Sequence, residues 1–107
     1  MTTFDNRDNA FENKFAHDEE LRFKATARRN RLLGLWAAEK LGLSGDKAAE
    51  YAAGVVRADF EEAGDEDVFR KIRADFDAAG VAQSDHQIRR TMAEMMELAV
   101  TQIRTEG

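Results

Sequence analysis

The residue types that most often carry catalysis are scarce in this chain and poorly placed for it. There is no cysteine, and the two histidines, His17 and His86, are far apart in the sequence. Zero cysteines exclude disulfides, thiolate catalysis and cysteine-ligated metals. Neither histidine has acidic or hydroxyl residues at the spacing of a catalytic or metal-binding motif, so we expect both at the surface. The sequence therefore predicts no enzyme, no metal site and no cofactor.

Two short stretches resemble ligand-binding loops, and both are better explained as helix ends. Residues 42–47 (GLSGDK) are similar to a phosphate loop, but they lack its preceding strand and the Ser or Thr after the lysine. Residues 75–86 have acids and a glycine at the first, third and sixth positions of a calcium loop. His86, however, stands where the bidentate glutamate is needed. We expect neither a phosphate nor a calcium site.

Protein binding is the chemistry that the N-terminal residues favour. Phe4, Phe11 and Phe15 are spaced i, i+7, i+11 and would share a narrow sector of one helical face. The rest of residues 1–17 is almost wholly polar, so we expect this segment to be disordered or to fray in isolation. Aromatic anchors on such a segment are typical of an arm that folds into a partner's groove. The first turns of an ordinary helix, docked on its own domain, would give the same pattern.

The charge changes sign where this arm ends. Residues 1–20 hold six acidic and two basic residues, whereas residues 21–31 hold five basic residues and no acid. Arg22, Arg28 and Arg29 belong to this basic stretch and are candidates for contact with acidic protein or phosphate, although a solvated helix face would look the same. A net charge of −5 argues against nucleic acid as the partner.

The elements that position these residues are predicted to be helices. The chain has 107 residues, no proline and abundant Ala, Glu, Arg and Leu, which indicates one all-α domain. Apolar periodicity and cap residues predict helices over residues 18–41, 44–63 and 65–79, and a fourth from Ser84 onward. Because the links are short, we expect a compact antiparallel four-helix bundle at residues 18–107, preceded by a mobile arm at residues 1–17.

Cap residues and inward faces can also be assigned. Gly42 and Gly80 are placed to follow helix C-termini, Ser44 is a good N-cap, and Ser84 with Gln87 makes a capping box. Gly34 lies within the first helix and indicates a close helix crossing. The methionines near residue 95 fit the core, although they could instead form an adaptable binding surface. The predicted core positions are Leu21, Ala25, Leu32, Leu33, Leu35, Trp36, Ala48, Ala52, Val55, Val56, Phe60, Val68, Phe69, Ile72, Phe76, Ile88, Met92, Met95, Ala99 and Ile103.

The sequence lacks the features of an inserted or exported protein. No apolar run approaches the length of a bilayer, and the first residues lack the basic region and apolar stretch of a signal peptide. We therefore expect a cytoplasmic protein without direct membrane insertion.

Four runs of residues give the chain a family resemblance. They are residues 3–7 (TFDNR), 11–24 (FENKFAHDEELRFK), 27–30 (ARRN) and 35–38 (LWAA). In these runs, and over essentially its whole length, the chain resembles the zeta subunit, the ATPase inhibitor of alphaproteobacterial ATP synthases. The resemblance implies a small four-helix bundle with a mobile N-terminal arm.

The resemblance also implies an activity and a set of contacts. The protein would bind the F1 sector of the ATP synthase, with its arm in a catalytic interface between α and β subunits near the γ stalk, and would block ATP hydrolysis. This would hold it at the inner face of the membrane through the ATP synthase. The inhibitory segment would be roughly residues 1–19, with further contacts in the basic stretch. The implied contact residues are Phe4, Arg7, Phe11, Lys14, Phe15, Arg22, Arg28 and Arg29.

Two other classes of function stay open from the residues alone. A helical adaptor for another cytosolic complex would use the same arm and leave ATP hydrolysis untouched. A nucleotide-binding regulatory bundle would place its ligand between helices, against the arginines and Trp36. Weak nucleotide binding is also compatible with the inhibitor interpretation.

Overall fold

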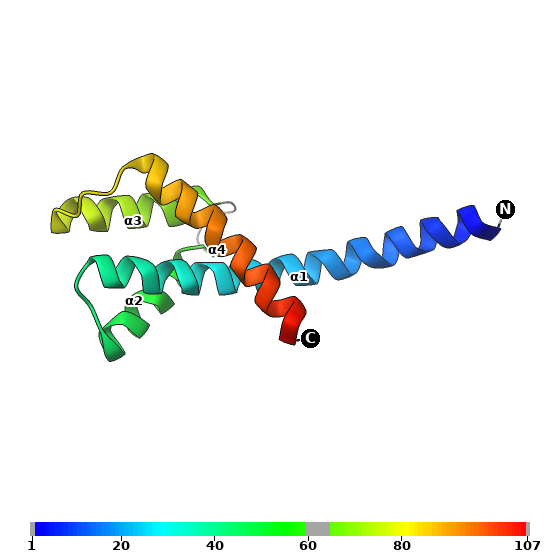
Figure 1. Cartoon of the computed structure of the whole chain (residues 1–107), viewed down its shortest axis with the longest axis horizontal. Coiled ribbons are helices and arrows are strands. Elements are labelled where there is room, and N and C mark those ends of the chain that lie inside the picture. The colour runs from blue at the N-terminus through cyan, green and yellow to red at the C-terminus, as the bar shows by residue number, and fades with distance from the viewer. Residues whose placement is uncertain (1, 60–64, 107) are drawn as a thin grey trace.

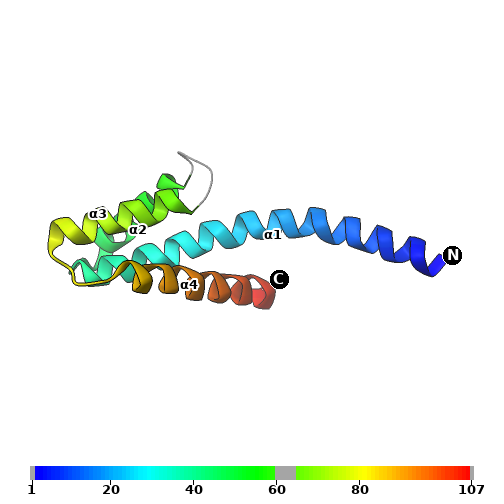
Figure 2. The same ribbon diagram turned by 90° about the horizontal axis from the view of Figure 1, so that it is seen from above.

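Helices make up almost all of the part of the chain that the structure describes. The computed structural model describes the backbone of residues 2–59 and 65–106, and the side chains of residues 19–59 and 65–106. The elements are α1 (Thr2–Lys40), α2 (Gly45–Ala58), α3 (Glu66–Ala79) and α4 (Asp85–Glu106). Consecutive helices run in opposite directions (Figures 1 and 2), which confirms the predicted all-α, antiparallel four-helix fold.

The longest element, α1, belongs to the bundle only through its C-terminal half. It has 39 residues, so it is about 58 Å long at the usual rise per residue. Its N-terminal half projects away from the other helices (Figure 1), and the molecule measures 62 × 25 × 23 Å. The helix begins at Thr2, well before the predicted start at Asp18. The acidic residues near position 18 suit a helix N-terminus, but residues 1–17 contain no Gly or Pro that would stop a helix there.

The helix ends confirm most of the predicted caps. Gly42 has a φ of +80°, and the amide of Leu43 donates to the Ala38 carbonyl at 2.8 Å, as expected for a glycine after a helix C-terminus. Ser84 Oγ accepts from the Gln87 amide at 3.1 Å while Gln87 Oε1 accepts from the Ser84 amide at 2.9 Å, which is the predicted capping box. Ser44 is the N-cap of α2, but its side chain makes no capping hydrogen bond.

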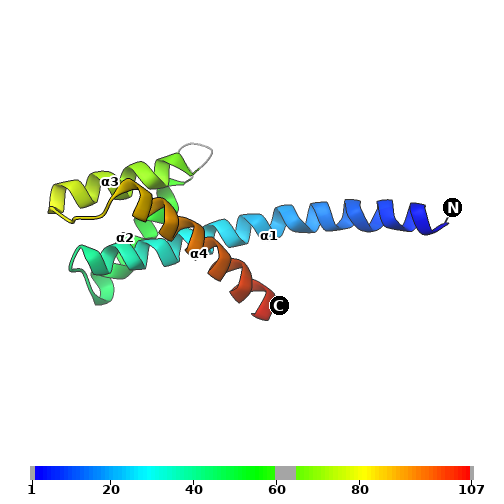
Figure 3. The same ribbon diagram turned by 45° about the horizontal axis from the view of Figure 1, so that its top comes forward.

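The core lies where the C-terminal half of α1 meets the other three helices. In this core α1 packs against α2 and α4, while α3 packs against α2 and α4 from the other side (Figure 3). Trp36 of α1 contacts Phe76 of α3, with ring centroids 5.6 Å apart. The buried cluster consists of Leu33, Ala37, Val55, Val68, Phe69, Ile72, Phe76, Ile88 and Met92.

Gly34 permits the predicted close crossing of α1 and α2. A Cβ atom at this position would lie 2.6 Å from Ala52 Cα and 3.1 Å from Ala52 Cβ. Since real Cβ atoms do not approach a backbone atom this closely, only glycine fits here without moving one of the helices.

Some predicted core positions and boundaries differ in the structure. Leu35 was predicted to face inward, but it is 38% exposed because it lies off the buried stripe of Leu33 and Ala37. The second helix ends at Ala58 rather than near residue 63, and the predicted core residue Phe60 lies outside the described residues. Met92 is buried and Met95 packs against the core, so these two methionines belong to the interior, whereas Met96 lines a surface pocket.

Candidate protein-binding surface

The five predicted arm contacts lie on the projecting half of α1. Phe4, Arg7, Phe11, Lys14 and Phe15 follow Thr2, where the helix begins, and their side chains lie outside the described residues. On a continuous helix, the spacing of the three phenylalanines would give them a common face. Their role as contacts, and the boundary between arm and bundle at residue 18, remain predictions.

The three arginines predicted as further contacts have very different surroundings. Arg22 is exposed, Arg28 is partly buried, and Arg29 is only 2% exposed. A partner that approaches the described surface can therefore reach Arg22, but it cannot reach Arg29 without a rearrangement. The three arginines share a charge and lie close together in the sequence. The rotation of α1 against its neighbours gives them different degrees of burial.

Arg28 joins α1 to the end of α4. Its guanidinium binds the Glu106 carboxylate with two hydrogen bonds, of 2.6 Å from Nη1 to Oε1 and 2.8 Å from Nη2 to Oε2. This hydrogen bonding lowers the pKa of Glu106 and raises the pKa of Arg28. A bidentate pair of this kind fixes the orientation of both side chains, so it holds the last turn of α4 against α1.

Arg29 joins α1 to the start of α3 from inside the protein. Its Nη2 donates to Asp65 Oδ1 at 2.8 Å, and its Nε donates to Asn30 Oδ1 at 2.8 Å. The hydrogen bond from Arg29 lowers the pKa of Asp65 although partial burial opposes this. A buried guanidinium needs such partners, so Arg29 serves the fold in this structure.

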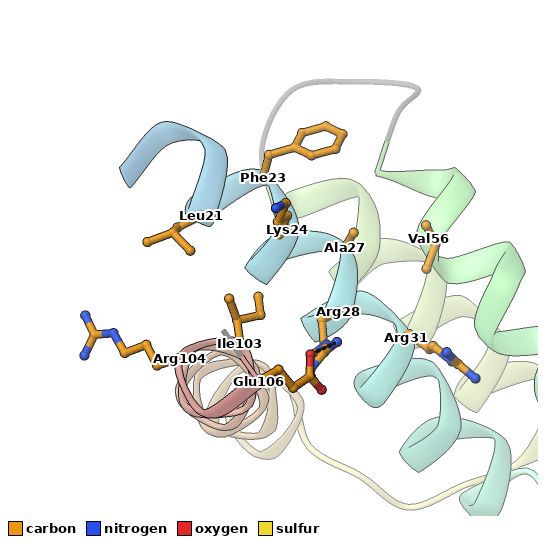
Figure 4. Close-up of a pocket in the computed structure, with 10 residues that line it drawn as sticks. All are labelled: Leu21, Phe23, Lys24, Ala27, Arg28, Arg31, Val56, Ile103, Arg104 and Glu106. Carbon is orange, nitrogen blue, oxygen red and sulfur yellow. Dashed lines mark hydrogen bonds and ion pairs between the residues drawn. The ribbon is translucent and has the colours of Figure 1, made fainter. Parts of the chain in front are cut away.

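A groove at the base of the projecting helix was not predicted from the sequence. It runs along the face of α1 between α2 and α4 and has a volume of about 770 Å³ (Figure 4). Apolar side chains from three helices line it, namely Leu21, Phe23, Ala27, Val56 and Ile103, together with the cations Lys24, Arg28, Arg31 and Arg104. Phe23 is 64% exposed. One signal could have indicated this surface: Phe23 is a large aromatic residue that lies off the inward stripe of Leu21 and Ala25.

The acidic residues of the stretch that resembles a calcium loop form hydrogen bonds and ion pairs with other side chains. Asp75 accepts from the Tyr51 hydroxyl at 2.7 Å and from Lys71 Nζ at 3.2 Å, and Asp77 is paired with Arg73 at 2.7 Å. Burial and the hydrogen bond to Asp75 raise the pKa of Tyr51. Among the described residues, no group of three His, Cys, Asp or Glu side chains could hold a metal ion.

No helix in the described ranges is both long enough and apolar enough to cross a membrane. His86 is exposed in the first turn of α4, as expected, and the side chain of His17 lies outside the described part.

The fold is that of a small all-α protein in which one long helix projects from a four-helix bundle. The family model of ATPase inhibitor subunit zeta matches residues 1–102. The chain therefore belongs to the ATPase inhibitor subunit zeta family, which confirms the resemblance seen in the sequence.

The fold also matches a solved structure. A structure described as a solution NMR structure is 49% identical to the chain, with a TM-score of 0.72. The match covers 81% of this chain and 99% of the other. No curated protein matches the chain at a significant level.

Proposed function

We propose that this protein inhibits the F1-ATPase by docking its N-terminal arm, residues 1–17, in a catalytic interface between α and β subunits near the γ stalk. One observation carries the proposal beyond the family name. The backbone of α1 continues from the bundle to Thr2 as a single helix, and its N-terminal half stands clear of the other three helices. A helix presented in this way can enter a cleft in a larger protein while the bundle stays outside.

The sequence of the arm supports docking by its aromatic face. Phe4, Phe11 and Phe15 would each remove a large apolar area from water in a partner's groove, where interface energy concentrates. Arg7 and Lys14, with the acidic residues of the arm, would set its orientation. Inhibition is then mechanical, because a helix lodged between two subunits prevents the closure that hydrolysis requires.

The bundle supports the arm without contributing chemistry to the reaction. The core and the Arg28–Glu106 and Arg29–Asp65 pairs hold the C-terminal half of α1 in place. This presents the arm at a high local concentration once the bundle lies near the ATPase. Binding to the ATP synthase would also place the protein at the inner face of the membrane without a membrane-spanning segment of its own.

The test is to titrate the full chain into F1-ATPase from the same source and to follow ATP hydrolysis. We expect hydrolysis to fall with a saturable dependence on the concentration of the protein. If hydrolysis is unchanged at saturating concentrations of the protein, the chain is not an inhibitor, and a helical adaptor for another complex is the better explanation. If ATP or ADP alone changes the fluorescence of Trp36 and hydrolysis is unaffected, a nucleotide-binding bundle is the better explanation.

A further inference from the structure

The groove on α1 begins where the projecting arm ends. Leu21 and Phe23 lie at its N-terminal end, directly after the arm, and Arg31 lies two turns further into the bundle (Figure 4). A protein that surrounds the arm must therefore extend toward this groove or turn sharply away from it. Continuity with the arm places the groove next to such a partner.

The side chains of the groove combine an apolar floor with cations that are largely without ion-pair partners among the described residues. Ala27, Val56 and Ile103 supply apolar surface from three helices, and Phe23 is 64% exposed at the end nearest the arm. Within the described residues Arg31 and Arg104 form no ion pair, and Lys24 has only an exposed contact of 3.5 Å with Glu20 on its own helix. Among the described residues that line the groove, Glu106 is the one carboxylate, and Arg28 already binds it.

The combination of apolar surface and cations in the groove favours a ligand that is acidic and has an apolar face. Uncommitted cations around a partly enclosed surface attract negative charge and repel basic segments. A simple anion would leave the apolar floor of the groove exposed to water. An amphipathic helix would cover this floor with apolar side chains at positions i, i+3 or i+4, and i+7. Addition of a β-strand needs an open sheet edge, and the described residues contain no strand.

We propose that the groove binds an acidic amphipathic helix of the ATPase that the arm inhibits. The inference rests on the proposed function, and it adds a second contact on the bundle whose residues are Phe23, Lys24, Arg31 and Arg104. The arm blocks the catalytic interface, and the groove holds the bundle beside the entrance to it. Since the two contacts are joined by one continuous helix, binding at the groove raises the effective concentration of the arm at its own site.

The two contacts make different contributions to inhibition, and a titration separates them. Loss of the groove contact should raise the concentration of protein that gives half-maximal inhibition, with the same inhibition at saturation. Loss of the arm contacts should reduce the inhibition itself. Part of the groove contribution is electrostatic, so it should weaken as the salt concentration rises.

The experiment compares full-length variants in the hydrolysis assay with F1-ATPase from the same source. The groove variant is Lys24→Glu with Arg31→Glu, and the matched control is Lys47→Glu with Arg57→Glu, which makes the same charge change on exposed residues of α2. We expect the groove variant to need about tenfold more protein for half-maximal inhibition, and the control to match the wild type. Phe23→Ala, which changes no charge, should act in the same direction. Circular dichroism and thermal melts verify that each variant is folded.

Separate outcomes overturn the inference and the proposed function. If wild type inhibits and both the charge variant and Phe23→Ala inhibit at the same concentration as wild type, the groove is no second contact and the arm proposal stands. If wild type does not inhibit, both proposals fail. If the groove variant loses binding to anionic lipid vesicles while its inhibition is unchanged, the ligand of the groove is a membrane surface and the inference is wrong.

Discussion

Two neighbouring arginines show how much the environment decides what a residue does. Arg28 is partly exposed and binds Glu106 at the end of α4, whereas Arg29 is buried and binds Asp65 at the start of α3. Each therefore ties α1 to a different helix. Their shared charge made both of them candidates for partner contact, but in this structure both act within the bundle.

The Arg29–Asp65 pair predicts a pH dependence of stability. The pKa of Asp65 is lowered below its ordinary value of 3.8 in the folded protein. Its contribution is therefore fully present above that value and is lost as the pH falls through the lower, folded-state pKa. We expect Asp65→Asn to cost about 1 kcal/mol at pH 7, a modest amount because the Asp65 side chain is 59% exposed. The difference from wild type in urea unfolding should shrink as the pH falls below 3.8 and through the lower, folded-state pKa.

A control variant that removes one negative charge elsewhere distinguishes the loss of the Arg29–Asp65 pair from a general effect of net charge on stability. Glu97→Gln on α4 removes the same charge from an exposed residue and should change the free energy of unfolding by less than about 0.5 kcal/mol at either pH. Equal losses in both variants would contradict a specific role for Asp65.

The position of Gly34 predicts that its replacement by alanine destabilises the protein, although alanine has the higher helix propensity. Alanine is favoured over glycine within a helix by about 1 kcal/mol, but the added Cβ would meet Ala52 Cα at 2.6 Å. We expect Gly34→Ala to destabilise the protein by about 1–3 kcal/mol. Gly54→Ala is the matched control, because its Cβ would meet only Lys71 and Arg57 side-chain ends at 3.8 and 3.9 Å. It should be neutral or stabilising in thermal melts.

At the scale of the elements, α1 serves two purposes along one continuous helix. Its C-terminal half supplies Leu33 and Ala37 to the core and packs against α2 and α4. Its N-terminal half projects from the bundle (Figure 2). Within the described residues, the buried cluster takes Leu33 and Ala37 from the C-terminal half of α1, so we expect the bundle to fold without the projecting half.

This division predicts that the bundle folds without the arm. Deletion of residues 1–17 should leave the thermal midpoint nearly unchanged, and the helix signal should fall by no more than the removed residues contribute. Circular dichroism with a thermal melt measures both quantities. A loss of cooperative unfolding in the shortened protein would mean that the phenylalanines of the arm belong to the core.

We expect a substitution on the inward face of α3 to destabilise the protein much more than a substitution on its outer face. Ile72 is fully buried between the helices, so Ile72→Ala should cost about 2–5 kcal/mol through lost burial and the cavity that remains. Ala74 is exposed on the same helix, and Ala74→Ser should cost less than about 0.5 kcal/mol. Similar values from denaturant unfolding of the two variants would show that the inward face of α3 is misassigned.

On the scale of the whole molecule, a bundle with one projecting helix suits a protein that blocks a larger machine. The long dimension of 62 Å comes largely from α1, and the other two dimensions are 25 and 23 Å. Such a shape allows the arm to reach into a partner while the bundle, with the groove on α1, stays at the partner's surface.

The aromatic face of the arm predicts the sharpest functional result. The double substitution Phe11→Ala with Phe15→Ala should reduce inhibition of ATP hydrolysis by at least about tenfold, since both rings would leave desolvated positions in the interface. Substitution of Glu12 or Asn13 by Ala should matter much less. Matched amounts of each protein are compared in the hydrolysis assay after circular dichroism verifies the fold. Equal inhibition by the double variant and wild type would rule out the aromatic face as the anchor.

Local features of this protein are determined by residues a few positions apart. The capping box at Ser84 and the turn at Gly42 join near neighbours in the chain. The inward stripe of α3 and the buried residues Ile88, Met92 and Ala99 of α4 follow the 3.6-residue period, whereas Ile103, also predicted inward, lines the groove. Local hydrogen bonds and periodicity do not depend on the rest of the fold, so these features were predicted correctly. The aromatic spacing of the arm is local in the same sense.

Features that depend on how α1 is rotated and placed against its neighbours required the folded structure. Arg29 is buried because its side of α1 faces the start of α3, and Leu35 is exposed because its side faces water. The groove combines Phe23 and Lys24 with Val56 of α2 and Ile103 of α4, residues that are distant in the sequence. Periodicity identifies the face of a helix that is buried, but it does not identify which residue of another helix lies opposite, because that pairing is set by the packing of the whole core.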